Sequence, residues 1–212
     1  PEPSVAGGTN YAHAGSKAGP DWVSDEFAKL GLPPDVNLRF DLYCADPPSP
    51  SNNFCFVPNA QVPTAITQVE AYKQEVGFPS FAPSQLAVLW TGANDLRDVA
   101  GDPDGPEAGA LNVVGNIVEA GRRIAKAGYR YQKRHVVVLN QLNAARAPIS
   151  QAACGGDADC LAQIEEGVKG FNLALALGLK KLQWELYLRG YRVEIHNVDV
   201  FAAGEAAAEV SE

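Results

Sequence analysis

Two short stretches of this chain combine residue types that can stabilise negative charge on an oxygen atom. The first covers residues 7–16 and reads GGTNYAHAGS, and the second covers residues 86–95 and reads LAVLWTGAND. Each stretch leads from an extended apolar segment into a loop that contains glycine. In such a loop a backbone N–H and a side-chain amide can be held against an oxyanion that forms during a reaction. The two stretches therefore predict the oxyanion-stabilising half of a catalytic site.

Gly15 and Asn94 are the candidate donors in these stretches. Glycine has no Cβ, so the main chain at Gly15 could approach a ligand closely and donate its N–H. The side-chain amide of Asn94 could donate a second hydrogen bond without giving up a proton. We expect Asp95 to fix the second loop by accepting backbone N–H bonds. The alternative is that Gly15 and Asn94 are ordinary turn residues.

The chain has no sequence pattern for a nucleophile and base that would accompany these donors. It contains no Gly-Asp-Ser, no Gly-x-Ser-x-Gly and no Asp-x-x-His segment. His13 lies in the first stretch, where it could approach the site or could only pack and orient the loop. His135 and His196 border predicted strands, and we expect both to be structural. The donors would therefore depend on a nucleophile from outside these residues.

Short apolar segments alternate with longer helical patterns along the chain. Apolar and β-branched segments predict strands over residues 9–14, 86–90, 135–139 and 192–196. Apolar residues spaced by three or four predict helices over about residues 64–76, 108–127 and 159–189. This alternation predicts an α/β fold of three layers, α/β/α, with a parallel sheet that helices cover on both faces.

The composition fits a single domain over residues 1–212. Hydrophobic residues make up 46% of the chain and charged residues 20%, which is the usual balance for a packed domain. Residues 20–60 depart from the strand and helix pattern, because they hold seven prolines and little periodicity. This excursion could be a lid or a wall of a substrate site, or a surface insertion without function.

Charge and hydropathy argue against two kinds of partner. The net charge of −8 argues against nucleic acid, whose partners need a clustered basic face. No segment approaches the roughly 20 apolar residues of a membrane span, so we expect no membrane-spanning helix. The chain begins at Pro1 without the features of a signal peptide, and we do not expect translation to start there.

The four cysteines fall into two local pairs, Cys44 with Cys55 and Cys154 with Cys160. Neither pair has the close spacing of a zinc site, and both flank loops rich in Pro, Asn, Gly or Asp. We therefore expect two disulfides and an oxidising compartment. The alternative is a set of four reduced thiols in a cytosolic protein.

The two loop stretches resemble conserved blocks of the GDSL/SGNH family of esterases and lipases. GGTNYAHAGS is similar to the second block of that family, and TGAND contains a pattern similar to its third block. The order of the later segments also resembles that of the family. These segments are VVVLN, a loop with Ala147-Pro148, a cysteine-containing segment, a helix with Phe171-Asn172, and the ending NVDVF. These segments resemble the larger secreted members, and the resemblance covers most of residues 5–201 except residues 18–60.

This resemblance implies a flavodoxin-like parallel sheet, the SGNH-hydrolase fold, and a secreted serine ester hydrolase that works through an acyl-enzyme. It implies that the Gly15 N–H and the Asn94 side-chain amide form the oxyanion hole. The supporting residues would be Asn10, Gly92 and Asp95. The substrate would be a small-molecule or lipid ester, and neither a metal nor a cofactor would be required.

Family members also carry Gly-Asp-Ser for the nucleophile and Asp-x-x-His for the base, and both blocks are absent from these residues. We therefore expect the sheet to be incomplete at both ends. The missing blocks would lie in the rest of a longer enzyme or on another polypeptide, and this chain alone would be inactive. The alternative from a different class is a non-catalytic binding or interaction module with the same flavodoxin-like architecture.

Overall fold

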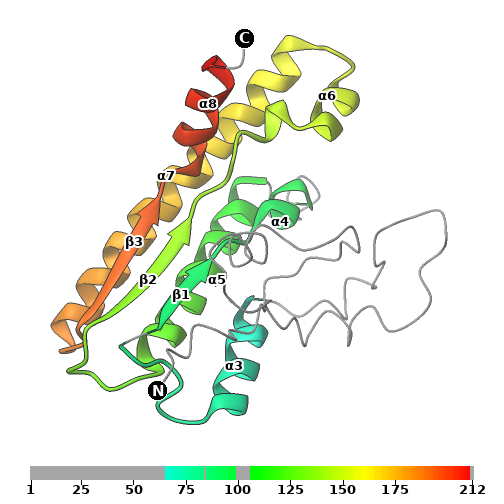
Figure 1. Ribbon diagram of the computed structural model, residues 1–212. Coiled ribbons are helices and arrows are strands. Elements are labelled where there is room, and N and C mark those ends of the chain that lie inside the picture. The colour runs from blue at the N-terminus through cyan, green and yellow to red at the C-terminus, as the bar shows by residue number, and fades with distance from the viewer. Residues whose placement is uncertain (1–64, 84, 99–105, 211–212) are drawn as a thin grey trace, which may run out of the picture.

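The computed structural model of this chain describes residues 65–83, 85–98 and 106–210 (Figure 1). The elements follow in the order α3 (Ala65–Val76), β1 (Leu86–Leu89), α4 (Ala93–Asp98), α5 (Pro106–Lys126), β2 (Arg134–Leu139), the 3-10 helix η3 (Ala144–Arg146), α6 (Pro148–Cys154), α7 (Ala158–Leu188), β3 (Val193–Val198) and α8 (Val200–Val210). The three helices predicted from the sequence correspond to α3, α5 and α7.

Several predicted features lie outside the described residues. These are the predicted strand over residues 9–14, the site residues Asn10, His13 and Gly15, the excursion over residues 20–60, and the pair Cys44 and Cys55. Each of these therefore stays a prediction.

Three parallel strands form one open sheet in the order β1-β2-β3. Leu86 of β1 pairs with His135 of β2, and Arg134 of β2 pairs with Val193 of β3. Helix α5 lies between β1 and β2 in the chain and α7 lies between β2 and β3, as parallel neighbours require. The predicted α/β class and parallel sheet are confirmed. Strand β3 reaches Val198, beyond the predicted strand end at residue 196.

The core lies between the sheet and helices α5 and α7, which run side by side against it (Figure 1). The sheet contributes Val136 and Val138 of β2 and Val193 of β3, and all three are buried. Both helices pack on the same face. The opposite face leaves Leu86 and Val88 exposed at 58% and 41%. One covered face is therefore established, and the third layer stays a prediction.

Helix α7 packs against the sheet through one apolar stripe. Asp157 caps the helix, because its Oδ1 accepts hydrogen bonds from the N–H groups of Asp159 and Cys160. Gly190 follows the end of the helix with φ of +77°, a left-handed conformation typical of helix ends. The buried positions are three or four residues apart, as predicted: Val168, Phe171, Leu175, Leu179, Leu182 and Leu186.

A disulfide joins Cys154 and Cys160, whose Cα atoms are 5.8 Å apart. Cys154 is the last residue of α6, and Cys160 lies in the first turn of α7. The turn between them uses Gly155 and Gly156 at φ of +59° and +84°. The predicted pairing of these two cysteines is confirmed.

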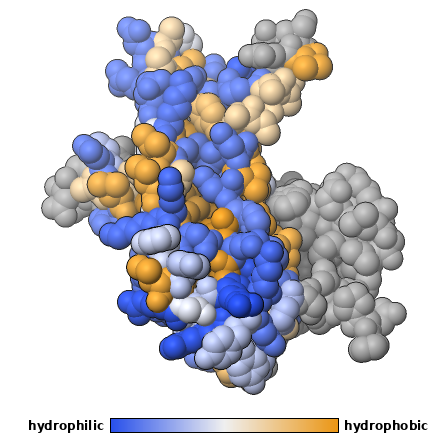
Figure 2. Space-filling view, turned by 90° about the vertical axis from the view of Figure 1, so that its left-hand side faces the viewer, coloured by the Kyte–Doolittle hydropathy of each residue, from blue (hydrophilic) through white to orange (hydrophobic). Residues whose placement is uncertain are grey.

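The outer surface of α7 is mixed in character. Leu173, Leu177, Trp184 and Leu188 are exposed along it. Figure 2 shows the side of the molecule on which α7 lies, and apolar residues form separate patches there among hydrophilic ones. Within the described part of the chain, no helix is both long and apolar enough to cross a membrane, in agreement with the sequence prediction.

Candidate functional site

Polar residues follow all three strands where they end at one edge of the sheet. Thr91 comes shortly after β1, Asn140 and Gln141 follow β2, and Asp199 follows β3. The strands are parallel, so their carboxyl ends lie together, and this edge is where open α/β sheets bind ligands. The candidate site is therefore built here.

Gly92 makes the turn from β1 into helix α4 possible. Its φ of +109° is one that residues with a Cβ rarely adopt. A Cβ at this position would also lie 3.2 Å from Ile117 Cδ1 and 3.3 Å from Val113 Cγ1. The carbonyl of Gly92 accepts a hydrogen bond from the Leu96 N–H at 2.9 Å, which closes the first turn of α4. The conformation therefore favours glycine strongly, and the packing leaves little room for a Cβ.

Asn94 is the second residue of α4. The backbone of the predicted oxyanion donor thus lies in the first turn of the helix that follows β1. Asp95 is exposed in the same turn. Gly92, Asn94 and Asp95 are brought together at the carboxyl edge, whereas the meeting of Asn94 with Gly15 stays a prediction.

The amide of Asn172, on α7, holds the main chain of Gln141. Its Oδ1 accepts a hydrogen bond from the Gln141 N–H at 2.8 Å, and its Nδ2 donates to the Gln141 carbonyl at 2.9 Å. The Gln141 side chain in turn donates from Nε2 to the carbonyl of Thr91 at 2.7 Å. Hydrogen bonds therefore link α7, the end of β2 and the end of β1 across the edge.

A second set of hydrogen bonds ties the end of β2 to the start of α8. Asn140 donates from Nδ2 to Asp199 Oδ1 at 2.8 Å, and its Oδ1 accepts from the N–H of Val200 at 2.8 Å and of Phe201 at 3.1 Å. Asp199 Oδ1 also accepts the Ala202 N–H at 3.0 Å and so caps α8. The bond from Ala202, followed by that from Asn140, lowers the pKa of Asp199. This carboxylate is therefore charged at neutral pH.

A shallow hollow of about 290 Å³ adjoins the ends of β2 and β3. Its lining combines polar and apolar side chains and comprises Asn140, Lys169, Asn172, Leu173, Ala176, Asn197, Asp199 and Phe201. Asn140, Asn172 and Asp199 thus take part both in the hydrogen bonds of the edge and in the wall of the hollow. A small polar group of a ligand could be held there by amide and carboxylate partners.

Two of the three histidines are described, and neither lines the hollow. His135 is the second residue of β2, and His196 lies within β3. The His135 Nδ1 and His196 Nε2 atoms are 2.9 Å apart, and the two rings stack with centroids 5.2 Å apart.

Sequence reasoning did not single out Asn140, Gln141, Asn172 or Asp199 as site residues. The position of three of these residues could have indicated the site. Asn140, Gln141 and Asp199 come directly after the apolar segments that form β2 and β3. Asn172 gives a weaker signal, because one asparagine within a long helix is compatible with an exposed position.

No protein-family model matches this chain, and a comparison with curated proteins finds no match either.

Proposed function

We propose that this chain is the oxyanion-stabilising part of a serine carboxylic-ester hydrolase of the GDSL/SGNH type. One observation supports this proposal most: the segment Gly92-Ala93-Asn94-Asp95 lies at the carboxyl edge of a parallel sheet, where Asn94 enters the first turn of α4. The positive φ of Gly92 gives the segment a defined turn there. The finer fold that we propose is a three-layer α/β/α fold, whose third layer covers the β1 end of the opposite face, where Leu86 and Val88 are exposed.

In the proposed reaction, a serine hydroxyl attacks the ester carbonyl and a histidine takes up its proton, which forms a tetrahedral intermediate. The Gly15 N–H and the Asn94 side-chain amide donate to the oxyanion of this intermediate. A donor of this kind contributes about 3 kcal/mol to transition-state stabilisation. The serine and histidine come from Gly-Asp-Ser and Asp-x-x-His blocks outside these residues. Departure of the alcohol leaves an acyl-enzyme, which water then hydrolyses.

The hydrogen bonds at the edge suit this function because they restrict motion where the reaction occurs. Asn172 fixes Gln141, and Gln141 fixes Thr91, which directly precedes Gly92. A donor raises the rate only if it is held in place before charge develops. The substrate class that we propose is a small-molecule or lipid ester. The Cys154–Cys160 bridge favours a secreted protein.

Labelling with a fluorophosphonate, followed by peptide mapping, tests the proposal directly. We expect the chain by itself to be unlabelled and inactive on a chromogenic short-chain ester. A preparation that also contains the serine-bearing segment should react, and the labelled serine should map outside residues 1–212. In that preparation Asn94→Ala should lower kcat by about 10²–10³-fold.

Asn112→Ala is the matched control, because Asn112 is exposed on α5. It should leave the rate unchanged. Label on a serine of this chain would show that the nucleophile is misassigned. An active preparation that is indifferent to Asn94→Ala would overturn the role of Asn94.

A further inference from the structure

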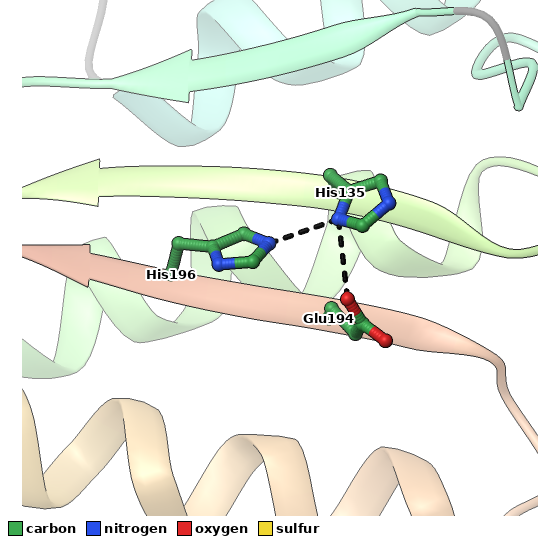
Figure 3. Close-up of side chains that lie close together, drawn as sticks. All are labelled: His135, Glu194 and His196. Atoms are coloured by element: carbon green, nitrogen blue, oxygen red, sulfur yellow. Dashed lines mark hydrogen bonds and ion pairs between the residues drawn. The ribbon is translucent and has the colours of Figure 1, made fainter.

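Three potential metal ligands lie together on the face of the sheet opposite α5 and α7. His135 comes from β2, and Glu194 and His196 come from β3 (Figure 3). One ligand atom from each side chain lies within 4.8 Å of the other two. The His135 Nδ1 atom is 2.9 Å from His196 Nε2 and 3.4 Å from Glu194 Oε2.

The backbone of the sheet fixes this arrangement. His135 pairs in register with Glu194, and Val137 pairs with His196. Glu194 and His196 are two residues apart on one strand, so their side chains point to the same face. The ligands therefore start from two hydrogen-bonded strands, and little conformational entropy would be lost when an ion binds.

Two of the three ligand separations are close to those in the coordination shell of a zinc-type ion. With a metal–nitrogen distance of about 2.05 Å, two ligands of a tetrahedral site lie about 3.3 Å apart. The separation between His135 and Glu194 is already close to this value. The two histidine nitrogens, which are hydrogen-bonded to each other, would have to give up that bond and move apart by about 0.4 Å when an ion binds.

The charged groups at the cluster are the carboxylate of Glu194 and its exposed partner Lys133. Lys133 Nζ lies 2.9 Å from Glu194 Oε1. The other oxygen of Glu194, Oε2, is the one nearer to His135. The Lys133 side chain is 62% exposed, so it can turn toward solvent when a cation binds.

We propose that His135, Glu194 and His196 form a binding site for a divalent transition-metal ion of the zinc type. Two imidazole nitrogens and one carboxylate oxygen match Zn²⁺, Ni²⁺ and Cu²⁺, whereas Mg²⁺ and Ca²⁺ prefer oxygen ligands. The His135 and Glu194 side chains are 38% and 49% exposed. Water can therefore reach the ion and complete its shell. The site is separate from the carboxyl edge and does not rest on the proposed hydrolase function.

Titration of the metal-free protein with Zn²⁺, followed by calorimetry and equilibrium dialysis, tests this site. We expect one Zn²⁺ ion per chain at the cluster and a rise in Tm when Zn²⁺ is added. His135→Asn and His196→Asn should each weaken this binding by about 100-fold or more, because loss of an outer-sphere partner alone costs 10–100-fold. A Co²⁺-loaded protein should show the visible absorption of a site with imidazole and carboxylate ligands, and His196→Asn should abolish it.

His13→Asn is the matched control, because it removes the third histidine of the chain and leaves the cluster intact. It should change the affinity by less than about twofold. Lys133→Ala should leave binding intact or tighten it, since a nearby positive charge is removed. Binding that survives in the folded His135→Asn/His196→Asn double variant would overturn the proposal. Absence of saturable binding at about 1 mM free Zn²⁺ would also overturn it.

Discussion

Asn172 satisfies both main-chain hydrogen-bonding groups of Gln141, at 2.8 Å for the Gln141 N–H and 2.9 Å for its carbonyl. The two residues are 31 positions apart in the chain. One side-chain amide on α7 therefore replaces the strand neighbour that Gln141 lacks after the end of β2. This contact holds the main chain just after it leaves the sheet, at the edge of the candidate site.

Replacing Asn172 by Ala should destabilise the protein. Gln141 is buried, so two main-chain groups would lose their partner, at a combined cost of about 2–4 kcal/mol. Asn172→Asp should also destabilise, because a carboxylate cannot donate to the Gln141 carbonyl. Urea denaturation measures both changes in the free energy of unfolding. The exposed Asn112→Ala serves as the control and should change it by less than about 0.5 kcal/mol.

Asp199 should make stability depend on pH in the acidic range. Hydrogen bonds from Ala202 and Asn140 lower its pKa in the folded protein below the ordinary value of 3.8. The stabilisation is therefore fully present above that ordinary value and is lost as the pH falls through the lower pKa of the folded state. Asp199→Asn should accordingly flatten the dependence of the unfolding free energy on pH below about pH 4.

Chemical denaturation at a series of pH values checks this effect. Glu166→Gln is a suitable control, because the Glu166 side chain is 73% exposed and pairs only at the surface with Lys169. Such pairs contribute little to stability. Equal pH profiles for Asp199→Asn and the unmodified protein would contradict the role of Asp199 as a charged cap of α8.

Reduction of the Cys154–Cys160 bridge should lower the free energy of unfolding by about 2 kcal/mol. The bridge closes a short loop, with a sequence separation of 6, so it restricts the unfolded chain only modestly. Denaturation with and without reductant measures the effect. In the Cys154→Ala/Cys160→Ala variant, any remaining sensitivity to reductant would report on Cys44 and Cys55. Thiol counting of the denatured, unreduced protein should find no free thiol if both predicted bridges form.

Gly128 and Gly115 should respond in opposite ways to replacement by Ala. A Cβ at Gly128 would overlap the main-chain oxygen of Phe81 and the guanidinium of Arg134. Arg134 is fully buried and cannot easily move, so Gly128→Ala should cost at least about 1–3 kcal/mol. Gly115 lies within α5 with open space around it, and Gly115→Ala should gain about 0.5–1 kcal/mol. Thermal unfolding distinguishes the two outcomes.

The sequence by itself determined the elements that depend on local patterns. Apolar residues three or four apart predicted α7, and Gly190 marked the point beyond its end. The β-branched run from His135 to Leu139 predicted β2. The Cys154–Cys160 pair could be read from its separation of 6 residues. These features depend on neighbours in the chain, so the residue types alone carry the information.

The candidate site was only partly predictable from the sequence, because some of its features depend on neighbours in the chain and others on strand pairing. Gly92 and Asn94 could be placed at a strand end, because the apolar segment before them and the glycine are adjacent in sequence. The end of β3 was predicted too early. Val198 has a pairing partner in Leu139, and strand length follows from such pairing rather than from propensity.

Only the tertiary structure decided which distant polar residues meet. Asn140 contacts Asp199, 59 residues away, and the His135 and His196 side chains meet over 61 residues. These contacts follow from the parallel register of the strands, which is set when α5 and α7 pack on one face of the sheet. A shift of one residue would turn every side chain to the other face. Register is a property of the packed sheet, and no local pattern in the chain contains it.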